Sequence, residues 1–528
     1  MHVYEMKSWT FEGKAPEGSW AQVTMKAHVR FPDCSETIIP GFYAGGDTYQ
    51  LRFLPLQAGV YHICVDGEVK AEFEEEALPS RGAHGPVRAR GTHLYYDDGT
   101  RFDSFGTTVY ALMHQSDALT DETMESLRRS PFNKVRLCVF PKHYLYNHNE
   151  PQYYAFEKRE DGSWDPHRPC MAFWDAFERK LERIFAMGIQ VDLILFHPYD
   201  RWGFESMPQA DHLVYLDYLL RRFAAYPMLW WSLANEYDLC RDMSVKDYEE
   251  IEEFVASHDP YHHMLGCHNC LAVWDYSRKN ITHASIQTKC LTRTAERIRK
   301  AGKPVLIDEC CYEGNLPEFW GSISGREMAA RFWRVHAVGG YCTHGETYLP
   351  GTEMSRGNTA TGEEEVVWWA RGGILHGESV SRIAFLRRVM ERLPGPLEPL
   401  DWGWNGGIGV TDAEMREKAA QGPEGRRFFM DLLADMGKEA RDDFCMSELE
   451  AAGHCGEQVF LWYKDLQCSA LSHIRLPENA AYDIYVIDTW NMTCSRTMED
   501  VSGQVDVQLP GREAMAILAL DTSLRGLF

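Results

Sequence analysis

The sequence predicts an α/β protein whose centre is a (β/α)8 TIM barrel, flanked by an N-terminal β-sandwich and a small C-terminal β-sandwich. Three observations support this prediction. The chain has 528 residues, more than one hydrophobic core accommodates. Short apolar runs alternate with helical patterns through the middle of the chain. Apolar residues alternate with polar ones near both ends. The predicted domains are residues 1–88, 89–400 and 401–528.

The N-terminal domain is predicted from period-two alternation. Val23, Met25, Val29 and Phe31 are separated by polar or small residues, and turn residues such as those at 45–47 interrupt the runs. Near the C-terminus, a Pro/Gly-rich passage at 393–407 and a helix near 426–436 precede apolar runs at 459–462, 484–487 and 516–519. These runs predict the strands of the C-terminal domain.

Eight strands are expected in the barrel. They fall at 104–110, 134–140, 190–196, 228–234, 263–268, 283–287, 304–308 and 339–343. Helical patterns lie between them, as in Phe173, Phe177, Leu181 and Ile184, with Gly188 as the expected stop. Eight βα units in this length favour a TIM barrel, and a doubly wound parallel sheet is the weaker alternative.

Composition restricts the class of partner. The formal net charge of -24 argues against nucleic acid, which is bound mainly through Lys and Arg. The sequence contains neither a signal-peptide pattern nor an apolar stretch long enough for a membrane helix, so no membrane partner is expected. The 15 cysteines lack zinc-site spacing and indicate reduced thiols, which favours a cytoplasmic location. We also consider contacts between identical subunits through the two β-domains.

Polar residues follow most of the predicted strands, at the edge where a TIM barrel carries its active site. In chain order these residues are Arg136, His197, Asn235, Glu236, His268, Gln287, Glu309, His344 and Glu346. Glu236 and Glu309 are three βα units apart, so their carboxylates are expected to face one cleft. Two such carboxylates can cleave a glycosidic bond, one as acid/base and the other as nucleophile.

At this point the sequence resembles clan A of the glycoside hydrolases, which have an Asn-Glu pair after strand four and a Glu after strand seven. Asn235-Glu236 and Glu309 match these positions. The segments WTFEG, GFYAGGDTYQLRFLPLQAGVYHICVDG, THLYYDDGTRFDSFGTTVYAL and GGYCTHGETY are similar to a group of bacterial endoglucanase and apiosidase-like proteins. The resemblance implies a retaining mechanism on a carbohydrate substrate, a plant-derived β-glycoside or oligosaccharide, without metal or organic cofactor.

The resemblance also implies roles for neighbouring residues. Arg136, His197 and His268 stand where such enzymes keep a supporting arginine and histidines, and Asn235 is expected to bind a sugar hydroxyl. Many members place a tyrosine near strand six, where this chain has Gln287, so Tyr312 is the alternative partner of the nucleophile. Resemblance alone leaves Asp308 open as the nucleophile, and strand alternation favours Glu309.

Two functions other than a retaining glycoside hydrolase are compatible with parts of the sequence. The histidines His197, His268 and His344 are also compatible with a metal-dependent barrel hydrolase, although no His/carboxylate cluster has ligand spacing. A non-catalytic sugar-binding protein would need aromatic platforms but neither glutamate. Tyr110, Trp202 and Trp368 are the aromatic residues expected to contact sugar rings.

Overall fold

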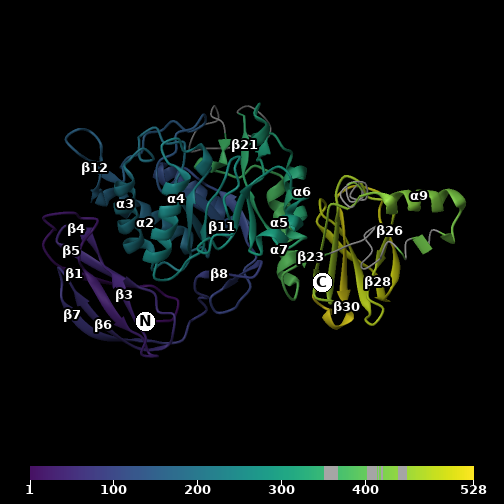
Figure 1. Ribbon diagram of the computed structural model, residues 1–528, viewed down its shortest axis with the longest axis horizontal. Helices are drawn as coiled ribbons and strands as arrows, with labels where there is room; N and C mark the ends of the chain where they lie inside the picture. The colour runs from purple at the N-terminus through teal and green to yellow at the C-terminus, as the bar shows by residue number, and fades with distance from the viewer. Residues whose placement is uncertain (350–366, 401–412, 414–415, 418–419, 438–439, 441–448) are drawn as a thin grey trace. The chain divides into compact units, whose positions relative to one another are not determined.

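The structure is a computed structural model that describes residues 1–349, 367–400, 413, 416–417, 420–437, 440 and 449–528 (Figure 1). It forms two compact units. The first unit comprises Met1–Gln287, Lys303–Glu309 and Thr343–His376. The second comprises Thr288–Gly302, Cys310–Cys342 and Gly377–Phe528. The domain boundaries predicted from the sequence remain a prediction, and part of the passage at 393–407 lies outside the described residues.

The first unit begins with two antiparallel sheets, as the alternation predicts. One sheet has the order β1 (Lys7–Glu12), β5 (Thr48–Phe53) and β4 (Phe42–Gly45). The other has the order β3 (Glu36–Pro40), β2 (Lys26–Arg30), β6 (Gly59–Asp66) and β7 (Ala71–Ala77). In β2 the side chains of Ala27 and Val29 are buried while their neighbours are exposed. A hairpin of β8 (Val87–Arg90) and β9 (His93–Tyr96) precedes the barrel strands.

An eight-stranded sheet follows, and its strands match the eight predicted ones. Its order is β16 (Leu265–Gly266), β15 (Leu229–Ala234), β14 (Gln190–Phe196), β11 (Lys134–Cys138), β10 (Phe105–Thr108), β20 (Tyr341–His344), β18 (Val305–Glu309) and β17 (Ala284–Gln287). A parallel bridge between His268 and Ser285 connects the two ends of this order. The sheet is therefore a nearly closed parallel barrel, which confirms the predicted fold class.

Helices alternate with these strands along the chain. They are α1 (Asp117–Arg129), α2 (Met171–Phe185), α3 (Gln209–Phe223), α4 (Val245–His258), α5 (Thr294–Ala301), α6 (Gly325–His336) and α7 (Ser379–Arg392). Helix α2 contacts β14 and α4 contacts β15. The predicted apolar face of α2 is buried, and Gly188, at φ 75°, follows the end of that helix. Short 3₁₀ turns, η1 (Leu112–His114), η2 (Tyr237–Leu239) and η5 (Trp369–Arg371), follow β10, β15 and β22 (Val367–Trp368).

The second unit contains the C-terminal sheets. A six-stranded sheet has the order β23 (Glu398–Pro399), β24 (Ala451–Cys455), β25 (Val459–Lys464), β30 (Met515–Asp521), β27 (Tyr482–Asp488) and β28 (Thr493–Val501). A two-stranded sheet pairs β26 (Leu471–Arg475) with β29 (Gln504–Gln508). The predicted helix is α9 (Glu424–Asp435). Trp462, Tyr482 and Ile517 belong to the core of this domain.

No helix among the described residues combines the length and the apolar character needed to cross a bilayer.

Candidate active site

Glu236 and Glu309 both lie at the carboxyl ends of barrel strands. Glu236 is two residues beyond the last residue of β15, and Glu309 is the last residue of β18. Glu236 has left-handed backbone angles, φ 52° and ψ 53°, which cost a non-glycine residue about 1–2 kcal/mol. Such local strain gathers at functional sites, where the surrounding structure fixes an uncommon conformation. Here it turns the chain from β15 into η2.

A tyrosine donates a hydrogen bond to each glutamate. The Tyr110 hydroxyl donates to Oε1 of Glu309 at 2.5 Å. The Tyr199 hydroxyl donates to Oε2 of Glu236, which also accepts a hydrogen bond from the Asn235 amide at 3.3 Å. Burial and the adjacent glutamate raise the pKa of both phenols, so both remain protonated donors. Each carboxylate is thus held by its own phenol.

The two glutamates interact electrostatically. Burial, followed by the negative charge of Glu236, raises the pKa of Glu309 to about 7. Lys142, the Tyr110 hydroxyl and Arg136 act in the opposite direction. Below about pH 7 the pair therefore retains a proton that two isolated carboxyl groups would have lost. One protonated and one ionised carboxyl is the state that acid-assisted glycoside cleavage requires.

Lys142 lies in a cage of aromatic rings beside the two glutamates. Its ammonium nitrogen is 4.4 Å from the ring centroid of Tyr110 and 4.1 Å from that of Tyr199. The rings of Tyr144 and Trp368 lie 5.8 and 5.9 Å away. Aromatic faces attract cations at these distances. The cage therefore places a positive charge against the same two phenols that hold Glu236 and Glu309.

Arg136 reaches Glu309 through Tyr110 rather than directly. Its Nη1 donates to the Tyr110 hydroxyl at 3.2 Å and to Asn235 Oδ1 at 3.4 Å, while its Nε donates to Asp192 at 3.1 Å. The guanidinium is completely buried. The predicted supporting arginine thus pairs with Asp192 and fixes two residues, Tyr110 and Asn235, that bond to Glu309 and Glu236.

Asp308 belongs to an ion-pair cluster inside the barrel. Its Oδ1 accepts from Lys134 at 2.7 Å, and Lys134 also lies 3.1 Å from Asp192. Ser285 and Thr343 donate to the Asp308 carboxylate at 2.6 and 2.8 Å. Burial opposes ionisation, but Lys134 and Arg136 hold the pKa of Asp308 far below its usual value. Its oxygens are occupied by protein donors, which disfavours Asp308 as a nucleophile.

The strand carries an irregularity at this point. Ile286 pairs with Ile307 and Gln287 pairs with Glu309, so Asp308 is the extra residue of a bulge. Simple alternation predicts opposite directions for Asp308 and Glu309. The bulge instead lets Asp308 enter the barrel interior while Glu309 still meets Tyr110.

The two supporting histidines bind backbone groups near the glutamates. His268 Nδ1 accepts from the backbone N–H of Glu236 at 3.4 Å. His197 Nδ1 accepts from the backbone N–H of Tyr199 at 3.2 Å. Burial lowers the pKa of both rings, that of His197 to about 3, so both are neutral acceptors. They position Glu236 and Tyr199.

Three other predicted residues contact partners other than the two glutamates. The Gln287 amide is 3.9 Å from Cys270 Sγ, and burial and then Glu236 raise the pKa of that thiol to about 12. Trp368 is buried and stacks on Tyr144 at 5.3 Å, within the lysine cage. The indole N–H of Trp202 donates to Glu150 at 2.8 Å, so Trp202 lies on the outer loops.

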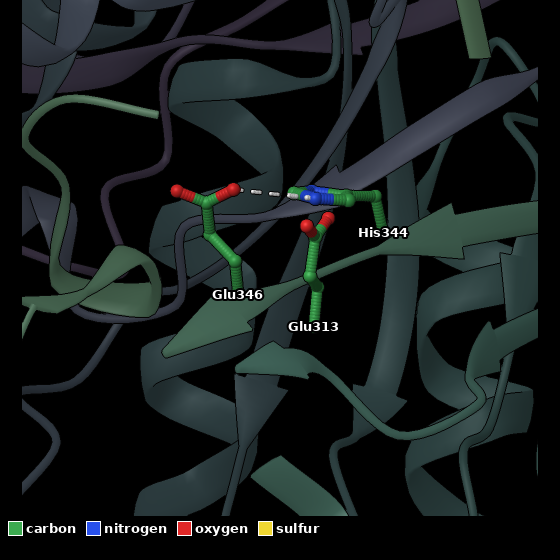
Figure 2. Close-up of side chains that lie close together, drawn as sticks. All are labelled: Glu313, His344 and Glu346. Carbon is green, nitrogen blue, oxygen red and sulfur yellow. Dashed lines mark ion pairs between the residues drawn. The ribbon is translucent and has the colours of Figure 1, made fainter. Parts of the chain in front are cut away.

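His344 and Glu346 have their own partners, away from the contacts described for Glu236 and Glu309. His344 Nδ1 is 3.2 Å from the Thr107 hydroxyl, and its ring stacks on Phe132 at 4.9 Å. Its Nε2 lies 3.6 Å from the Glu346 carboxylate (Figure 2), which accepts from the backbone N–H of His376 at 2.5 Å. Neither has a recorded contact with Glu236 or Glu309 among the described residues.

Figure 2 also shows Glu313, which like His344 and Glu346 is of a residue type that binds metal ions. Imidazole and carboxylate groups are the ligands that a catalytic zinc takes, usually three from the protein. The Glu313 carboxylate accepts from the backbone N–H groups of Glu378 and Ser379 at 2.7 and 3.2 Å. The existing hydrogen bonds of Glu313 and Glu346 would compete with a metal ion.

Tyr312 belongs to the second unit, where its ring contacts Trp320 edge-on at 5.6 Å. Within the first unit, Tyr110 is the tyrosine that donates to Glu309. Sequence reasoning missed Tyr199 and Lys142 altogether. Both stand a few residues beyond a strand, in HPYD and FPKHY, and that position was the available signal.

Comparisons with known proteins agree with the barrel fold. The profile of the apiosidase-like catalytic domain family matches residues 88–395, and that of a domain of unknown function (DUF5605) matches residues 448–519. A presumed glycoside hydrolase from Bacteroides vulgatus ATCC 8482 is 28% identical, with TM-score 0.82 and 99% of each chain covered. A family 5 glycoside hydrolase from the same organism is 15% identical, with TM-score 0.58, covering 84% of this chain and 95% of that one, which supports the fold. No curated protein matches significantly.

The family match covers more than half of the chain, including every barrel strand and both glutamates. With its parallel barrel and its pair of carboxylates at the strand ends, this chain belongs to the apiosidase-like catalytic domain family and is a glycoside hydrolase.

Proposed function

We propose that this enzyme cleaves its substrate with retention of anomeric configuration, with Glu309 as nucleophile and Glu236 as general acid/base. The observation that carries the proposal is the unequal support of the two carboxylates. Burial and the charge of Glu236 raise the pKa of Glu309, while Lys142, Tyr110 and Arg136 favour its ionised form, so Glu309 is the carboxylate of the pair once Glu236 holds the proton. Oε2 of Glu309 has no hydrogen-bond partner among the described residues, so it is the oxygen that attacks.

In the first step Glu309 Oε2 attacks the anomeric carbon while Glu236 gives its proton to the departing glycosidic oxygen, and the C–O bond breaks. In the second step water attacks the anomeric carbon of the glycosyl-enzyme. Glu236 takes a proton from that water, and the Glu309 carboxylate leaves. Asn235 is fixed between Arg136 and Glu236 and is assigned to a hydroxyl of the sugar.

For the substrate we propose a neutral, plant-derived β-glycoside or oligosaccharide. The partly exposed aromatic rings of Tyr144 and Tyr199 suit the apolar faces of a sugar. The test of this substrate class is a panel of aryl β-glycosides and α-L-arabinofuranosides. Because the family is named for apiosidases, the panel also includes aryl β-apiosides. The predictions of a cytoplasmic location and of subunit association stay open to test.

The test of the catalytic assignment is covalent trapping. A 2-fluoro sugar matched to the active panel member forms a glycosyl-enzyme that decays slowly, and peptide mapping is expected to find it on Glu309. NMR of the first product should show the anomer of the substrate. An adduct on Glu236 would reverse the two roles. Inverted product would replace direct attack by an activated water, a mechanism found where the two carboxyl groups are about 6.5–9.5 Å apart rather than about 5–5.5 Å.

Glu236→Ala gives a second, independent test. Substrates with a very good leaving group need little protonation in the first step, so this variant should lose far less activity on them than on unactivated glycosides. Azide should accelerate their turnover, because it attacks the glycosyl-enzyme without needing a general base. Equal losses on both substrate types, without azide rescue, would remove Glu236 from the acid/base role.

A further inference from the structure

A second cavity lies in the first unit, away from the catalytic glutamates. It has a volume of about 920 Å³, within the range of small-molecule sites. It lies between the loop that follows β11, the start of α1 and one face of α2. Its lining includes His114, Gln115, Asn149, Tyr153 and Lys180, and it includes neither Glu236 nor Glu309.

The floor of this cavity carries an ammonium group without a carboxylate partner. Lys180 is 8% exposed, and its Nζ donates to the backbone carbonyls of Met113 and Gln115 at 3.2 and 2.8 Å. It forms no ion pair with any residue that the structure describes. A lysine ammonium has three N–H donors, so one remains after these two bonds. A buried charge normally pairs with an opposite one, and burial lowers the pKa of Lys180 to about 8.

A histidine beside this lysine has an unsatisfied nitrogen. His114 also lines the cavity and is 8% exposed, and its Nε2 has no hydrogen-bond partner in the described part of the chain. Its ring stacks on Phe173 at 6.0 Å. Burial, and then the charge of Lys180, lower the pKa of His114 to about 3, so the ring is neutral. Its Nε2 is fully enclosed and the ring also interacts with the backbone of Phe140 and Val139, so His114 forms part of the cavity wall.

The walls are suited to a sugar ring. The Gln115 amide donates to Asn147 Oδ1 at 3.1 Å, and the Asn149 amide donates to the backbone carbonyl of His114 at 2.9 Å. These bonds fix three amide side chains around the opening. Tyr153, which is 39% exposed, offers an aromatic face at the rim. Ordered amides and an exposed aromatic ring are groups that bind hydroxyls and the apolar face of a carbohydrate.

Acidic groups stand only at the exposed rim of the described lining. Asp117 is exposed, and its negative charge raises the pKa of Lys180 without forming an ion pair. Glu150 is exposed and already accepts from Tyr154 and Trp202, each at 2.8 Å. Away from the rim the charge is therefore positive, and the Lys180 ammonium has one N–H left to donate to an anion.

We propose that this cavity is a second ligand site that binds a sugar residue carrying an anionic group, with Lys180 contacting the anion and Tyr153 covering the ring. A carboxylate on a uronic acid and a phosphate on a sugar phosphate share this chemistry. The site is independent of the catalytic proposal, because none of its lining residues touches Glu236 or Glu309.

The experiment is isothermal titration calorimetry of the full chain with three probes: D-glucuronate, D-glucose 6-phosphate and neutral D-glucose. At least one anionic probe is expected to bind with a millimolar dissociation constant, about tenfold or more tighter than glucose. The anion that binds more tightly identifies the source of the negative charge. Binding is expected to persist in a Glu236→Gln/Glu309→Gln variant, which separates this site from the catalytic one.

Lys180→Gln should weaken the anionic probe by about tenfold or more, since it removes the charge and keeps a donor. Lys279→Gln is the matched control at an exposed lysine and should bind as the wild type does. If Lys180→Gln does not fold, Tyr153→Ala at the rim is expected to weaken the same probe several-fold. Equal binding of glucose and both anions, unchanged affinity in the folded variants, or no binding at about 10 mM probe would overturn the proposal.

Discussion

Replacing Tyr110 and Tyr199 one at a time by phenylalanine tests the two glutamate roles against each other. Each phenol donates to one carboxylate, Tyr110 to Glu309 and Tyr199 to Glu236. A hydrogen bond to a charged group contributes about 1.5–3 kcal/mol. Because the bond stabilises the ionised form, its loss should raise the pKa of the affected carboxyl by about 1–2.

The two variants should move opposite limbs of the pH profile of kcat/KM. In Tyr110→Phe the nucleophile ionises at higher pH, so the acid limb of the profile moves to higher pH. At pH values below that limb, kcat/KM falls about 10–100-fold. In Tyr199→Phe the acid/base residue keeps its proton to higher pH, so the basic limb moves up. The pH range of activity therefore becomes narrower on the acid side in Tyr110→Phe and wider on the basic side in Tyr199→Phe.

The assay is kcat/KM against pH on the active aryl glycoside, with circular dichroism to check that both variants fold. Tyr154→Phe serves as the control, since its hydroxyl bonds Glu150 on the outer loops. If Tyr110→Phe moved the basic limb and Tyr199→Phe the acid limb, the catalytic roles would have to be exchanged. Unchanged limbs in both would show that the phenols do not tune the glutamates.

The remaining predictions concern stability and metal. The folded pKa of Glu309, about 7, exceeds the ordinary value of 4.5, so its ionisation should destabilise the fold as pH rises from about 4.5 to 7. Glu309→Gln should then raise the free energy of unfolding at pH 8 by at most about 3 kcal/mol and leave it unchanged near pH 4, as measured by urea titration. Asp308→Asn should instead lose about 3–5 kcal/mol at pH 7, because it leaves the buried Lys134 without its closest partner. A variant as stable as the wild type would contradict this account of Asp308. Exhaustive chelation should leave kcat/KM unchanged, whereas activity lost to the chelator and restored by zinc or manganese would support a metal-dependent reaction.

The sequence predicts the barrel well because its signals are local. Each barrel strand is a short apolar run, and each predicted helix has its own periodicity, so neither depends on distant contacts. Asn235-Glu236 and Glu309 were found in the same way, as polar residues directly after such runs. Their roles were assigned from resemblance.

The contacts that distinguish the two glutamates could not be predicted in this way. Tyr110 and Glu309 are 199 residues apart in the chain, and Tyr199 and Glu236 are 37 apart. Their hydrogen bonds depend on the register of neighbouring strands and on loop conformations. The bulge at Asp308 is a further example, because an extra residue changes which side chains share a face and nothing in LIDE signals it.

Two groups of charges, one inside the barrel and one at its strand ends, show how the surroundings of a carboxyl group determine whether it holds a proton. In the interior, Lys134 and Arg136 face Asp192 and Asp308, so two cations balance two anions at contact distances of 2.7–3.1 Å. The pKa of Asp308 is held far below its usual value, so Asp308 has no proton to give near neutral pH. At the strand ends, Glu236 and Glu309 accept hydrogen bonds from phenols, and the Lys142 ammonium lies over the rings of the same two phenols. Burial and the charge of Glu236 keep a proton on this pair up to about pH 7. The full pairing of Asp308 therefore favours a role in stability, whereas the weaker pairing of Glu309 supports its proposed reaction with the substrate.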